Sequence, residues 1–460
     1  MFRVVVVALL LGALLPAHAE QAPRSRFGVV EGFWFPELTC ELGAGWERII
    51  FDWSQHQPTG PDDWNTLNVD DRWLKAASLC GREVVALLKN TPAWATDGIP
   101  MAGVPRGLTL PIDDPNNYWA AFVYRTVDYY ASRGVTRFII WNEPDIEAGT
   151  YGHEFSGDLE DYFQLLRVAY LSAKRANPAA RIHLAGTTYW HDVNEGRAPY
   201  FERLLDRILA DPDAAANNYY FDAMSLHLYF RTETVIRIVN EMRDNLRRHG
   251  MDKAIWINEM NAAPTDDPNW PVVRPQYPLD LEQQAAFLVQ AAALALTVGV
   301  ERMAAYKLYD QMLPEGAESF GLLTPGSAAP RPAFYAWRFV ANHFGDAVQA
   351  RYAATNTLDT VHLTHARGVQ SWVLWARRDQ PVRVRVTATS DKAYLLDHRG
   401  GAQILHPVEG AYTLLLPPAR CNANDGCFIG GVPFTLVQPM GAATITELTP
   451  RGEATLRYND

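Results

Sequence analysis

Two short segments of the sequence, FIIWNEP (residues 138–144) and IWINEM (residues 255–260), decide the fold because they end in the same way. In each segment an asparagine and a glutamate follow a run of large apolar residues. Such a run is typical of a buried strand, so the glutamate stands where the strand leaves the core. Glu143 and Glu259 therefore predict two acidic side chains at the ends of two buried strands.

The chain around these segments repeats one alternation. Between residues 27 and 310, short apolar runs rich in β-branched residues alternate with longer stretches of helical periodicity, which is typical of βα units around a parallel sheet. The runs that we interpret as strands are residues 27–30, 48–53, 83–88, 138–141, 182–186, 223–228, 254–257 and 303–309.

Helical periodicity fills the segments between the strands. The expected helices are residues 69–80, 117–133, 159–176, 200–210, 232–248, 281–298 and 332–343. Asp158 is placed to cap the helix over 159–176, and only the first crossover is too short for a long helix. Repeated βα units of this number and length predict a (β/α)8 barrel, which typically takes about 250 residues.

A barrel of this kind places its active site at the carboxyl ends of its strands. In our strand order Glu143 follows the fourth strand and Glu259 the seventh, so the two side chains can face each other across the mouth. Glycoside hydrolysis needs such a pair, one group to protonate the leaving oxygen and one to attack or to activate water. We expect the pocket to raise the pKa of the proton donor and to lower the pKa of the nucleophile.

The paired strand ends resemble the clan A retaining glycoside hydrolases, and family 39 in particular, over residues 27–343. The resemblance implies that Glu143 is the general acid/base, that Glu259 is the nucleophile, and that Asn142 binds the 2-hydroxyl of the sugar. SLHLYF (residues 225–230) fits the same family. It implies that Tyr229 hydrogen-bonds Glu259, with His227 nearby; alternatively, both are ordinary rim or core residues.

The sequence departs from the family pattern after the eighth strand. Many clan A members have a tryptophan there beneath the sugar, whereas this chain has AAYKLYD (residues 304–310), which contains Lys307 and Tyr309. Lys307 and Lys89 could bind an acidic or heavily hydroxylated substrate. Equally, either lysine could pair with a neighbouring carboxylate such as Asp52 or Glu31.

The chain has 14 Trp, several of which fall in or beside the expected strand-end loops. Indole rings there can stack on the faces of sugars, and as a set we expect several in the cleft. For any single tryptophan a place in the core is equally compatible with the sequence. The tryptophans concerned are Trp34, Trp53, Trp94, Trp190 and Trp270.

After residue 345 the sequence pattern changes to short runs in which apolar and polar residues alternate, separated by turns. This pattern predicts a small antiparallel β-sandwich. We therefore divide the chain into residues 1–19, 20–344 for the barrel and 345–460 for the sandwich. No flexible linker separates the last two, so we expect tight packing. Trp372 and Trp375 are three apart on one strand, so at most one of them can face a ligand.

The N-terminal segment indicates that the protein is exported. Residues 1–19 read as a cleaved signal peptide, which predicts a secreted or periplasmic protein without a membrane span. The formal net charge of -11 argues against a nucleic-acid partner. Cys421 is expected to pair with Cys427, while Cys40 and Cys80 form either a disulfide or two buried free thiols.

These features together predict a monomeric, secreted retaining glycosidase that cleaves β-linked polysaccharide or oligosaccharide, acts within chains, and needs no cofactor or metal. Two alternatives stay open. One is a catalytically silent carbohydrate-binding protein of an exopolysaccharide system, and the other is an exo-acting enzyme of the xylosidase or iduronidase kind.

Overall fold

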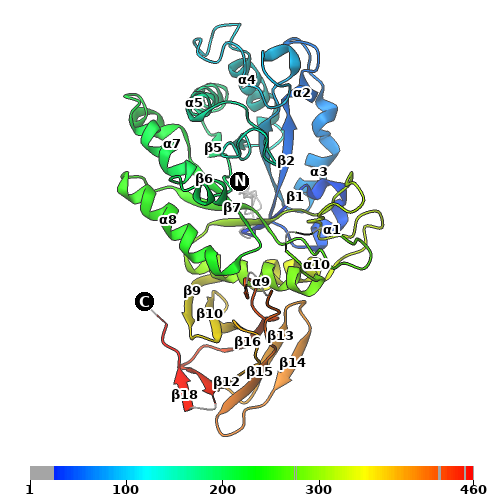
Figure 1. The fold of residues 1–460 in the computed structure, drawn as a ribbon, viewed down its shortest axis with the longest axis vertical. Coiled ribbons are helices and arrows are strands. Elements are labelled where there is room, and N and C mark those ends of the chain that lie inside the picture. Colours follow the sequence, from blue (N-terminus) through cyan, green and yellow to red (C-terminus); the bar gives the residue numbers. More distant parts are fainter. Residues whose placement is uncertain (1–24, 274, 276, 423–425, 450–451, 459–460) are drawn as a thin grey trace, which may run out of the picture.

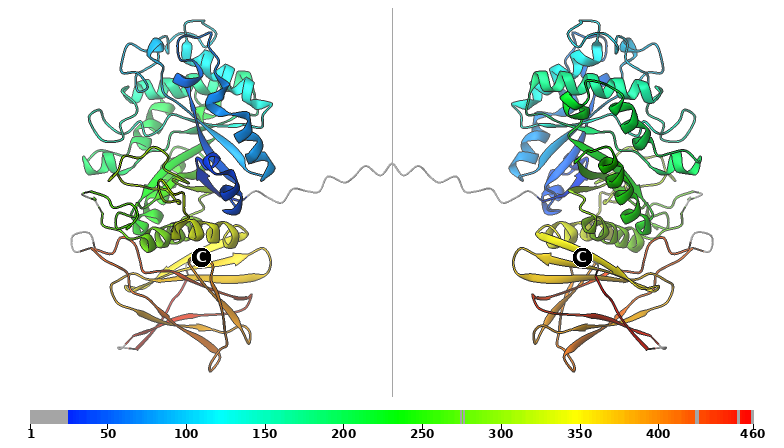
Figure 2. Two further views of the ribbon diagram at one scale, coloured as in Figure 1. Left: turned by 90° about the vertical axis from the view of Figure 1, so that its right-hand side faces the viewer. Right: turned by 90° about the vertical axis from the view of Figure 1, so that its left-hand side faces the viewer.

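The computed structural model describes residues 25–273, 275, 277–422, 426–449 and 452–458. It contains an α/β barrel with a β-sandwich packed beneath it (Figures 1 and 2). The predicted signal peptide, residues 1–19, lies outside the described residues. No helix in the described ranges is long and apolar enough to cross a bilayer.

The barrel is closed by parallel strands in chain order, and β8 pairs back with β1. This confirms the predicted (β/α)8 barrel. Its strands are β1 (Phe27–Val30), β2 (Trp46–Asp52), β3 (Glu83–Lys89), β4 (Arg137–Ile140), β5 (Arg181–Leu184), β6 (Ala223–Tyr229), β7 (Ala254–Asn261) and β8 (Arg302–Ala305).

Helices cover the outside of the barrel (Figure 1). The α-helices are α1 (Pro36–Glu41), α2 (Trp53–His56), α3 (Asp71–Leu79), α4 (Tyr118–Ala131), α5 (Leu159–Ala176), α6 (Trp190–Asn194), α7 (Tyr200–Leu209), α8 (Val235–Arg248), α9 (Leu281–Thr297) and α10 (Pro332–His343). Short 3-10 helices are η1 (Gly32–Trp34), η2 (Thr66–Val69), η3 (Ala93–Ala95), η4 (Ala215–Tyr220) and η5 (Thr232–Thr234).

Local signals placed several helix ends correctly. Asp158 caps α5 as predicted, and the structure adds a reciprocal capping box with Asp161. As expected for the short first crossover, α1 is only six residues long. The prediction for the eighth strand was wrong at its end, because β8 stops at Ala305 and the following residues form the wall of a cavity. Propensity alone does not mark where an apolar strand becomes a loop.

The amino end of the barrel is filled by aromatic and charged side chains. The Trp46 and Trp256 rings pack 5.0 Å apart. Glu83 accepts from Arg137 at 2.9 Å and from Arg302 at 2.5 Å, and the Arg302 guanidinium lies 4.7 Å from the Trp256 ring. This end is therefore a packed core, and the cavity described below opens at the other end.

The sandwich consists of two antiparallel sheets, as predicted. One sheet has the order β14-β13-β16-β11-β10-β9 and the other β15-β12-β17-β18. The strands are β9 (Ala347–Ala354), β10 (Leu358–His365), β11 (Val369–Ala376), β12 (Val382–Thr387), β13 (Ala393–Asp397), β14 (Ala402–Leu405), β15 (Ala411–Leu416), β16 (Phe434–Pro439), β17 (Ile445–Thr449) and β18 (Gly452–Thr455).

The larger sheet packs against α9 and α10, so the barrel and the sandwich share part of one core (Figure 2). Trp375, 1% exposed, belongs to this shared core, whereas Trp372, also 1% exposed, lies in the core between the two sheets. The two rings point to opposite faces of β11, as their spacing predicted. Gln290 of α9 adds a 2.8 Å hydrogen bond from its Nε2 to the Gly431 carbonyl.

Both predicted cysteine pairs are present as disulfides. Cys421 is bonded to Cys427, and Cys40 is bonded to Cys80, which resolves the alternative of two free thiols. The Cys40–Cys80 bridge ties α1 to the C-terminal end of α3. Disulfides persist in oxidising compartments, which agrees with the expectation of export.

Candidate active site

Glu143 is held just beyond β4 by an abrupt change in the backbone. Trp141 and Glu143 both adopt left-handed conformations, with φ of 69° and 41°. Such conformations are unfavourable for non-glycine residues and persist where the surroundings fix them, often at functional sites. Here the Trp141 indole donates to the Glu154 carbonyl at 3.0 Å, and the Glu143 N–H donates to the Gly186 carbonyl at 3.0 Å. The prediction that Trp141 ends the strand was therefore wrong by one residue.

Glu259 is positioned by an irregularity in β7. The strand continues to Asn261, and its register against β6 shifts so that Glu259 lies opposite His227. A second shift, against β8, follows Ile257. Such bulges re-aim side chains and are frequent beside active sites. The predicted strand stopped at Ile257 because the polar residues that follow it were taken as its end.

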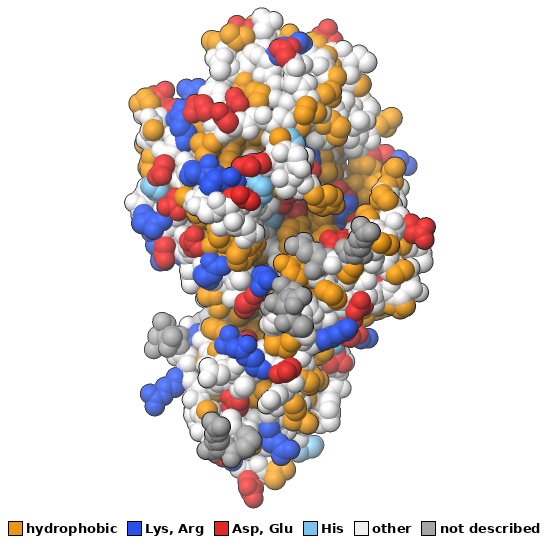
Figure 3. Space-filling view, viewed as in Figure 1, with side chains coloured by type: hydrophobic (Ala, Val, Ile, Leu, Met, Phe, Trp, Pro, Cys, Tyr) orange, Lys and Arg blue, Asp and Glu red, His pale blue; other side chains and the backbone are white. Residues whose placement is uncertain are grey.

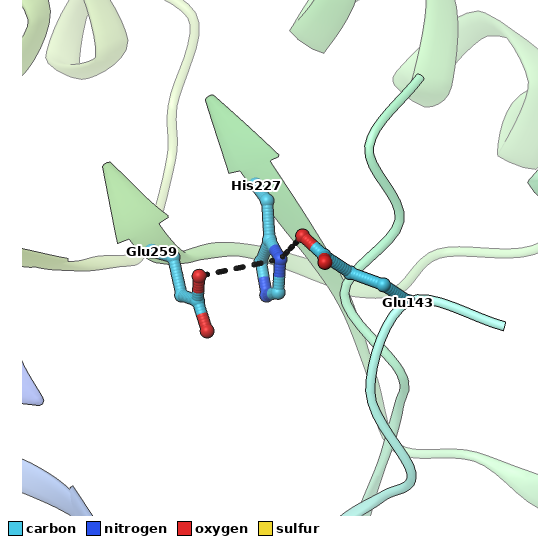
Figure 4. A group of neighbouring side chains, drawn as sticks. All are labelled: Glu143, His227 and Glu259. Atoms are coloured by element: carbon cyan, nitrogen blue, oxygen red, sulfur yellow. Dashed lines mark hydrogen bonds and ion pairs between the residues drawn. The ribbon is translucent and has the colours of Figure 1, made fainter. Parts of the chain in front are cut away.

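His227 lies between the two glutamates (Figure 4). Its Nδ1 is 2.6 Å from Glu143 Oε1 and 3.5 Å from Glu259 Oε2. One oxygen of each carboxyl group and the ring nitrogen all lie within 4.8 Å of one another. The imidazole fits only because residue 186 is glycine, since a Cβ there would come within 2.1 Å of His227 Nε2. The fold thus brings together two side chains that are far apart in the sequence.

Two further groups hold the Glu259 carboxylate. Arg48 of β2 places its Nη2 2.5 Å from Glu259 Oε1, and both side chains are almost fully buried. The Tyr229 hydroxyl donates to the other oxygen, Oε2. Both Glu259 oxygens therefore have charged or hydroxyl donors, whereas Glu143 has the His227 ring as its side-chain partner among the described residues.

The two environments shift the pKa values of the glutamates in opposite directions. Burial raises the pKa of Glu143, and the opposing attraction of His227 does not cancel this effect. Burial also acts to raise the pKa of Glu259, but the charges of Arg48 and His227 and the Tyr229 hydrogen bond outweigh it and lower that pKa. The two pKa values are therefore pushed apart, upward for Glu143 and downward for Glu259, in the directions expected from the sequence.

A cavity of about 650 Å³ opens above the two glutamates at the carboxyl end of the barrel. Figure 3 shows one face of the molecule hollowed between its loops. The lining contains both carboxyl groups, several aromatic rings and paired charges. Its polar and aromatic members are Glu31, Arg48, Lys89, Asn142, Glu143, Tyr151, Glu154, Thr188, Tyr229, Phe230, Glu259, Tyr306, Asp310, Glu318 and Phe320.

A second cavity of about 370 Å³ continues the first along the loop that follows β8. The two cavities share Glu31, Tyr306, Asp310 and Leu313. Trp34 and Lys307 line only the second. The two cavities therefore adjoin at the loop that follows β8.

Both lysines predicted at the site are paired with carboxylates. Lys89 Nζ lies 2.6 Å from Glu154 Oε2, and Lys307 Nζ lies 2.6 Å from Glu31 Oε2. The proposed partner Glu31 is therefore present for Lys307, whereas the partner of Lys89 is Glu154 and not Asp52. Asn142, also predicted at the site, lines the cavity and donates from Nδ2 to Glu154 Oε2 at 2.9 Å.

The aromatic side chains predicted at the site are mostly elsewhere. Trp53 is 0% exposed and packs between Trp119 and Phe122, so its assignment to substrate binding was wrong. Strand-end position does not specify whether an indole points into the mouth or outward under the helices.

Three other predicted rings are partly exposed but do not line either cavity. Trp94 packs on Tyr118 and donates to the Gln57 carbonyl at 2.6 Å. Trp190 packs against Tyr189, and Tyr309 lies edge-on to Phe35. The structure thus places Trp94, Trp190 and Tyr309 around the cleft and outside its lining.

Arg48 and Glu154 are the main site residues that sequence reasoning missed. Arg48 was taken as the first residue of a strand, whereas β2 begins at Trp46 and carries Arg48 into the barrel. A charged residue inside an apolar strand is a usable signal, because a buried cation needs an acidic partner. Glu154 comes from the loop after β4, where no pattern in the sequence marks its direction.

Glu143, His227 and Glu259 are also the residues of the described chain whose donor atoms lie close enough together to hold a metal ion. Glu259 Oε1 is already paired with the Arg48 guanidinium at 2.5 Å, and its Oε2 accepts from the Tyr229 hydroxyl, so a cation here would lie close to a buried positive charge. The arrangement suits a protonated and an ionised carboxyl group better than two metal ligands.

The chain is similar in structure to glycoside hydrolases. It matches a family 39 glycoside hydrolase from Bacteroides cellulosilyticus WH2 at 18% identity and a TM-score of 0.67, with 90% of this chain and 81% of that chain covered. It matches a GH30 endoxylanase from Clostridium papyrosolvens C71 at 14% identity, a TM-score of 0.59 and coverage of 91% and 97%. It matches a GH39 β-xylosidase from Caulobacter crescentus at 16% identity, a TM-score of 0.56 and coverage of 92% and 98%.

No family model and no curated protein sequence matches the chain. The likeness is therefore one of three-dimensional structure, and it extends over nine-tenths or more of the chain in each case. The chain shares its fold with the clan A glycoside hydrolases of families 39 and 30.

Proposed function

We propose that this protein is a retaining glycoside hydrolase in which Glu143 is the general acid/base and Glu259 the nucleophile. The observation that carries the proposal is the meeting of these two carboxyl groups at the floor of the cavity, with oxygens within 4.8 Å and pKa values shifted in opposite directions. Retaining enzymes hold their two carboxyl groups about 5 to 5.5 Å apart, whereas inverting enzymes leave about 6.5 to 9.5 Å for a water molecule. The separation favours retention.

The reaction then proceeds in two balanced steps. Glu259 attacks the anomeric carbon while Glu143 gives its proton to the departing oxygen, which yields a glycosyl ester and the free alcohol. Glu143, now ionised, takes a proton from water as that water attacks the anomeric carbon and releases Glu259. Arg48 and Tyr229 keep Glu259 ionised before it attacks. They also stabilise the carboxylate that forms again when the ester is hydrolysed. Asn142 binds the 2-hydroxyl group of the sugar.

The substrate that we propose is a β-linked polysaccharide outside the cytoplasm, cleaved within the chain. The two adjoining cavities support endo action, because together they offer room for sugars on both sides of the cleaved bond. The two disulfides support an extracellular or periplasmic location. The similar structures include both an endoxylanase and a β-xylosidase by name, so they support either mode of action.

The test is covalent trapping. A 2-deoxy-2-fluoro glycoside slows the second step, so mass spectrometry of the intact protein should show one added sugar, and peptide mapping should place it on Glu259.

Proton NMR during hydrolysis of a β-glycoside should show the β-anomer as the first product. Polysaccharides that are shortened internally at early times would support endo action, whereas release of monosaccharide alone would favour an exo enzyme.

The same experiment addresses the binding-protein alternative. A catalytically silent carbohydrate-binding protein would bind oligosaccharides with saturation but form no adduct and release no product. An adduct on a residue other than Glu259, or an α-configured first product, would contradict the roles proposed for the two glutamates.

A further inference from the structure

The segment that precedes β16, residues 426–431, packs against the barrel as well as the sandwich. Cys427 is bonded to Cys421, and Phe428 and Ile429 follow directly. Phe428 is 4% exposed and Ile429 1% exposed, and both belong to the core cluster that contains the barrel helices. The sandwich therefore contributes two apolar side chains to the core of the barrel.

The backbone of this segment is hydrogen-bonded to the loop that follows β6. The Phe428 carbonyl accepts from the Thr232 N–H and from the Thr232 hydroxyl, both at 3.1 Å. Gln290 of α9 donates from Nε2 to the Gly431 carbonyl at 2.8 Å, and its Oε1 accepts from the Gly430 N–H at 3.0 Å. Thr232 is 4% exposed and Gln290 0%, so these bonds are shielded from water. The segment and the loop after β6 are thus held together.

A row of aromatic rings leads from Phe428 to the cavity above the two glutamates. The Phe428 ring lies 5.2 Å from the Tyr277 ring, which lies 5.0 Å from the Phe230 ring. Phe230 and Phe320 line the cavity, and their rings are 5.9 Å apart. The Phe320 ring in turn lies 5.3 Å from the Tyr229 ring. Rings at such separations attract one another beyond the effect of burial alone, so the row connects the sandwich to Tyr229.

The backbone of the loop after β6 adopts a conformation that needs support. Phe230 is left-handed, with φ of 63°, which is unfavourable for a bulky residue. Its N–H donates to the Asn261 carbonyl at 3.0 Å, and the Arg231 N–H donates back to the Tyr229 carbonyl at 2.7 Å. Such a conformation persists where its surroundings fix it, and the packing that begins at Phe428 is part of these surroundings. Tyr229 directly precedes this turn, so its position depends on the same contacts.

We propose that Phe428 of the sandwich is a positioning residue that holds Tyr229 against the Glu259 carboxylate. The sandwich then contributes to catalysis through the end of β6, without contacting the substrate. The inference rests on the proposed hydrolase function, because Tyr229 acts on the reaction through Glu259.

Several charged or titratable groups face Glu259, and Tyr229 is the one at the end of the aromatic row. Burial raises the pKa of Glu259, whereas Arg48, His227 and the Tyr229 hydroxyl lower it. A Tyr229 ring that is held less firmly should donate less well, so the pKa of Glu259 should rise. The other groups that face Glu259 are Arg48 of β2, His227 of β6, Glu143 beyond β4 and Tyr306 beyond β8.

The test is the pH profile of kcat/KM on an aryl β-glycoside. Phe428→Ala should lower kcat/KM about threefold at neutral pH and should move the acid limb, where Glu259 gains a proton, to higher pH. Phe428→Leu keeps most of the apolar volume and should return the limb most of the way to its wild-type position. Thr232→Val removes the hydroxyl contact with the same segment and should shift the limb in the same direction, whereas Thr232→Ser should leave it in place.

A double-mutant cycle tests whether Phe428 acts through Tyr229. Tyr229→Phe/Phe428→Ala should place the acid limb where Tyr229→Phe alone places it, because the hydrogen bond that Phe428 supports is already absent. Phe344→Ala is the matched control. Phe344 is fully buried in the same core cluster at the end of α10, so its truncation should lower the melting temperature without moving the limb.

An acid limb that stays fixed in Phe428→Ala would overturn the inference, as would a shift that adds in full to that of Tyr229→Phe or that appears equally in Phe344→Ala. If Phe428→Ala does not fold, the limbs of Phe428→Leu and Thr232→Val decide in the same way. Wild-type protein that hydrolyses no glycoside, and takes no fluorosugar label on Glu259, would overturn the hydrolase function itself and with it this inference.

Discussion

The ends of β4 and β7 carry the same dipeptide, Asn-Glu, yet the structure gives the two glutamates opposite properties. At β4 the strand stops and left-handed residues turn Glu143 out into the cavity, with its side chain 15% exposed. At β7 the strand continues through a bulge, and Glu259, 5% exposed, lies under Arg48 and Tyr229. The pKa of Glu143 is raised by burial, whereas the pKa of Glu259 is lowered by its partners despite burial.

The chemistry of a carboxyl group is thus set by its neighbours and not by the motif that contains it. A desolvated acid with a weak partner keeps its proton, and a desolvated acid beside a buried guanidinium gives its proton up. Substitutions at the two glutamates and their neighbours can therefore test how each strand end acquires its properties.

The largest effect should come from the glutamates themselves. Glu259→Gln should lower kcat/KM on the order of 10⁴-fold or more on every substrate, because an amide cannot form the glycosyl ester. Glu143→Gln should lose less on aryl glycosides, whose leaving groups depart without a proton, than on polysaccharides. Parallel kinetics on both substrate types would check this, and equal losses for the two variants on both types would contradict the division of roles.

Removing the Arg48 guanidinium should make the pKa of Glu259 more like that of Glu143. Arg48→Met should raise the pKa of Glu259, so the acid limb of the pH profile, where kcat/KM falls as Glu259 gains a proton, should move to higher pH. The loss at neutral pH should be about 10²-fold. The measurement is kcat/KM across pH.

Arg331→Met is the matched control for Arg48→Met. Arg331 forms a buried 2.8 Å pair with Asp267 outside the cavity lining, so its removal should cost stability without moving the acid limb. An acid limb that shifts equally in both variants would contradict a specific action of Arg48 on Glu259.

A smaller effect is expected from the phenol. Tyr229→Phe removes one hydrogen bond to the Glu259 carboxylate and should lower kcat/KM about tenfold, with an upward move of the acid limb in the same direction as Arg48→Met. Tyr189→Phe, which removes a 2.7 Å bond to Glu241 away from the cavity, should leave the profile in place. A downward shift of the limb in Tyr229→Phe would be inconsistent with the contact.

The smallest effect concerns the residue that the two ends share. His227 opposes the upward shift in the pKa of Glu143, so His227→Asn should raise that pKa further. Activity requires protonated Glu143 and falls as pH rises through its pKa. The basic limb should therefore move to higher pH, by about one unit. A basic limb that stays fixed would show that His227 does not tune Glu143.

The barrel could be predicted from the sequence because its signal is redundant. Every βα unit repeats the same alternation, so an error of up to four residues at a strand end leaves the strand order unchanged. The meeting of Glu143 and Glu259 was predictable for the same reason, since strand order brings the two strand ends to the same mouth of the barrel. The prediction that Asp158 caps α5 was correct because capping is a local interaction within one turn of helix.

The rest of the site depends on side-chain direction, which a one-dimensional pattern does not contain. Trp53 and Arg48 both belong to the second strand region, yet the indole packs outward under α4 and the guanidinium points inward to Glu259. Lys89 was placed correctly, but its partner Glu154 comes from an irregular loop. Contacts of this kind follow only when the whole chain is folded.

The shared core between the larger sheet and helices α9 and α10 bears on how the molecule melts. Val361, Leu363 and Trp375 of the sheet are buried in the same cluster as the barrel's own helices. Cutting the chain between the two parts would leave this apolar surface in water on both sides. We expect calorimetry to record a single cooperative unfolding transition, with the sandwich acting as a foundation for the barrel and not as a detachable module.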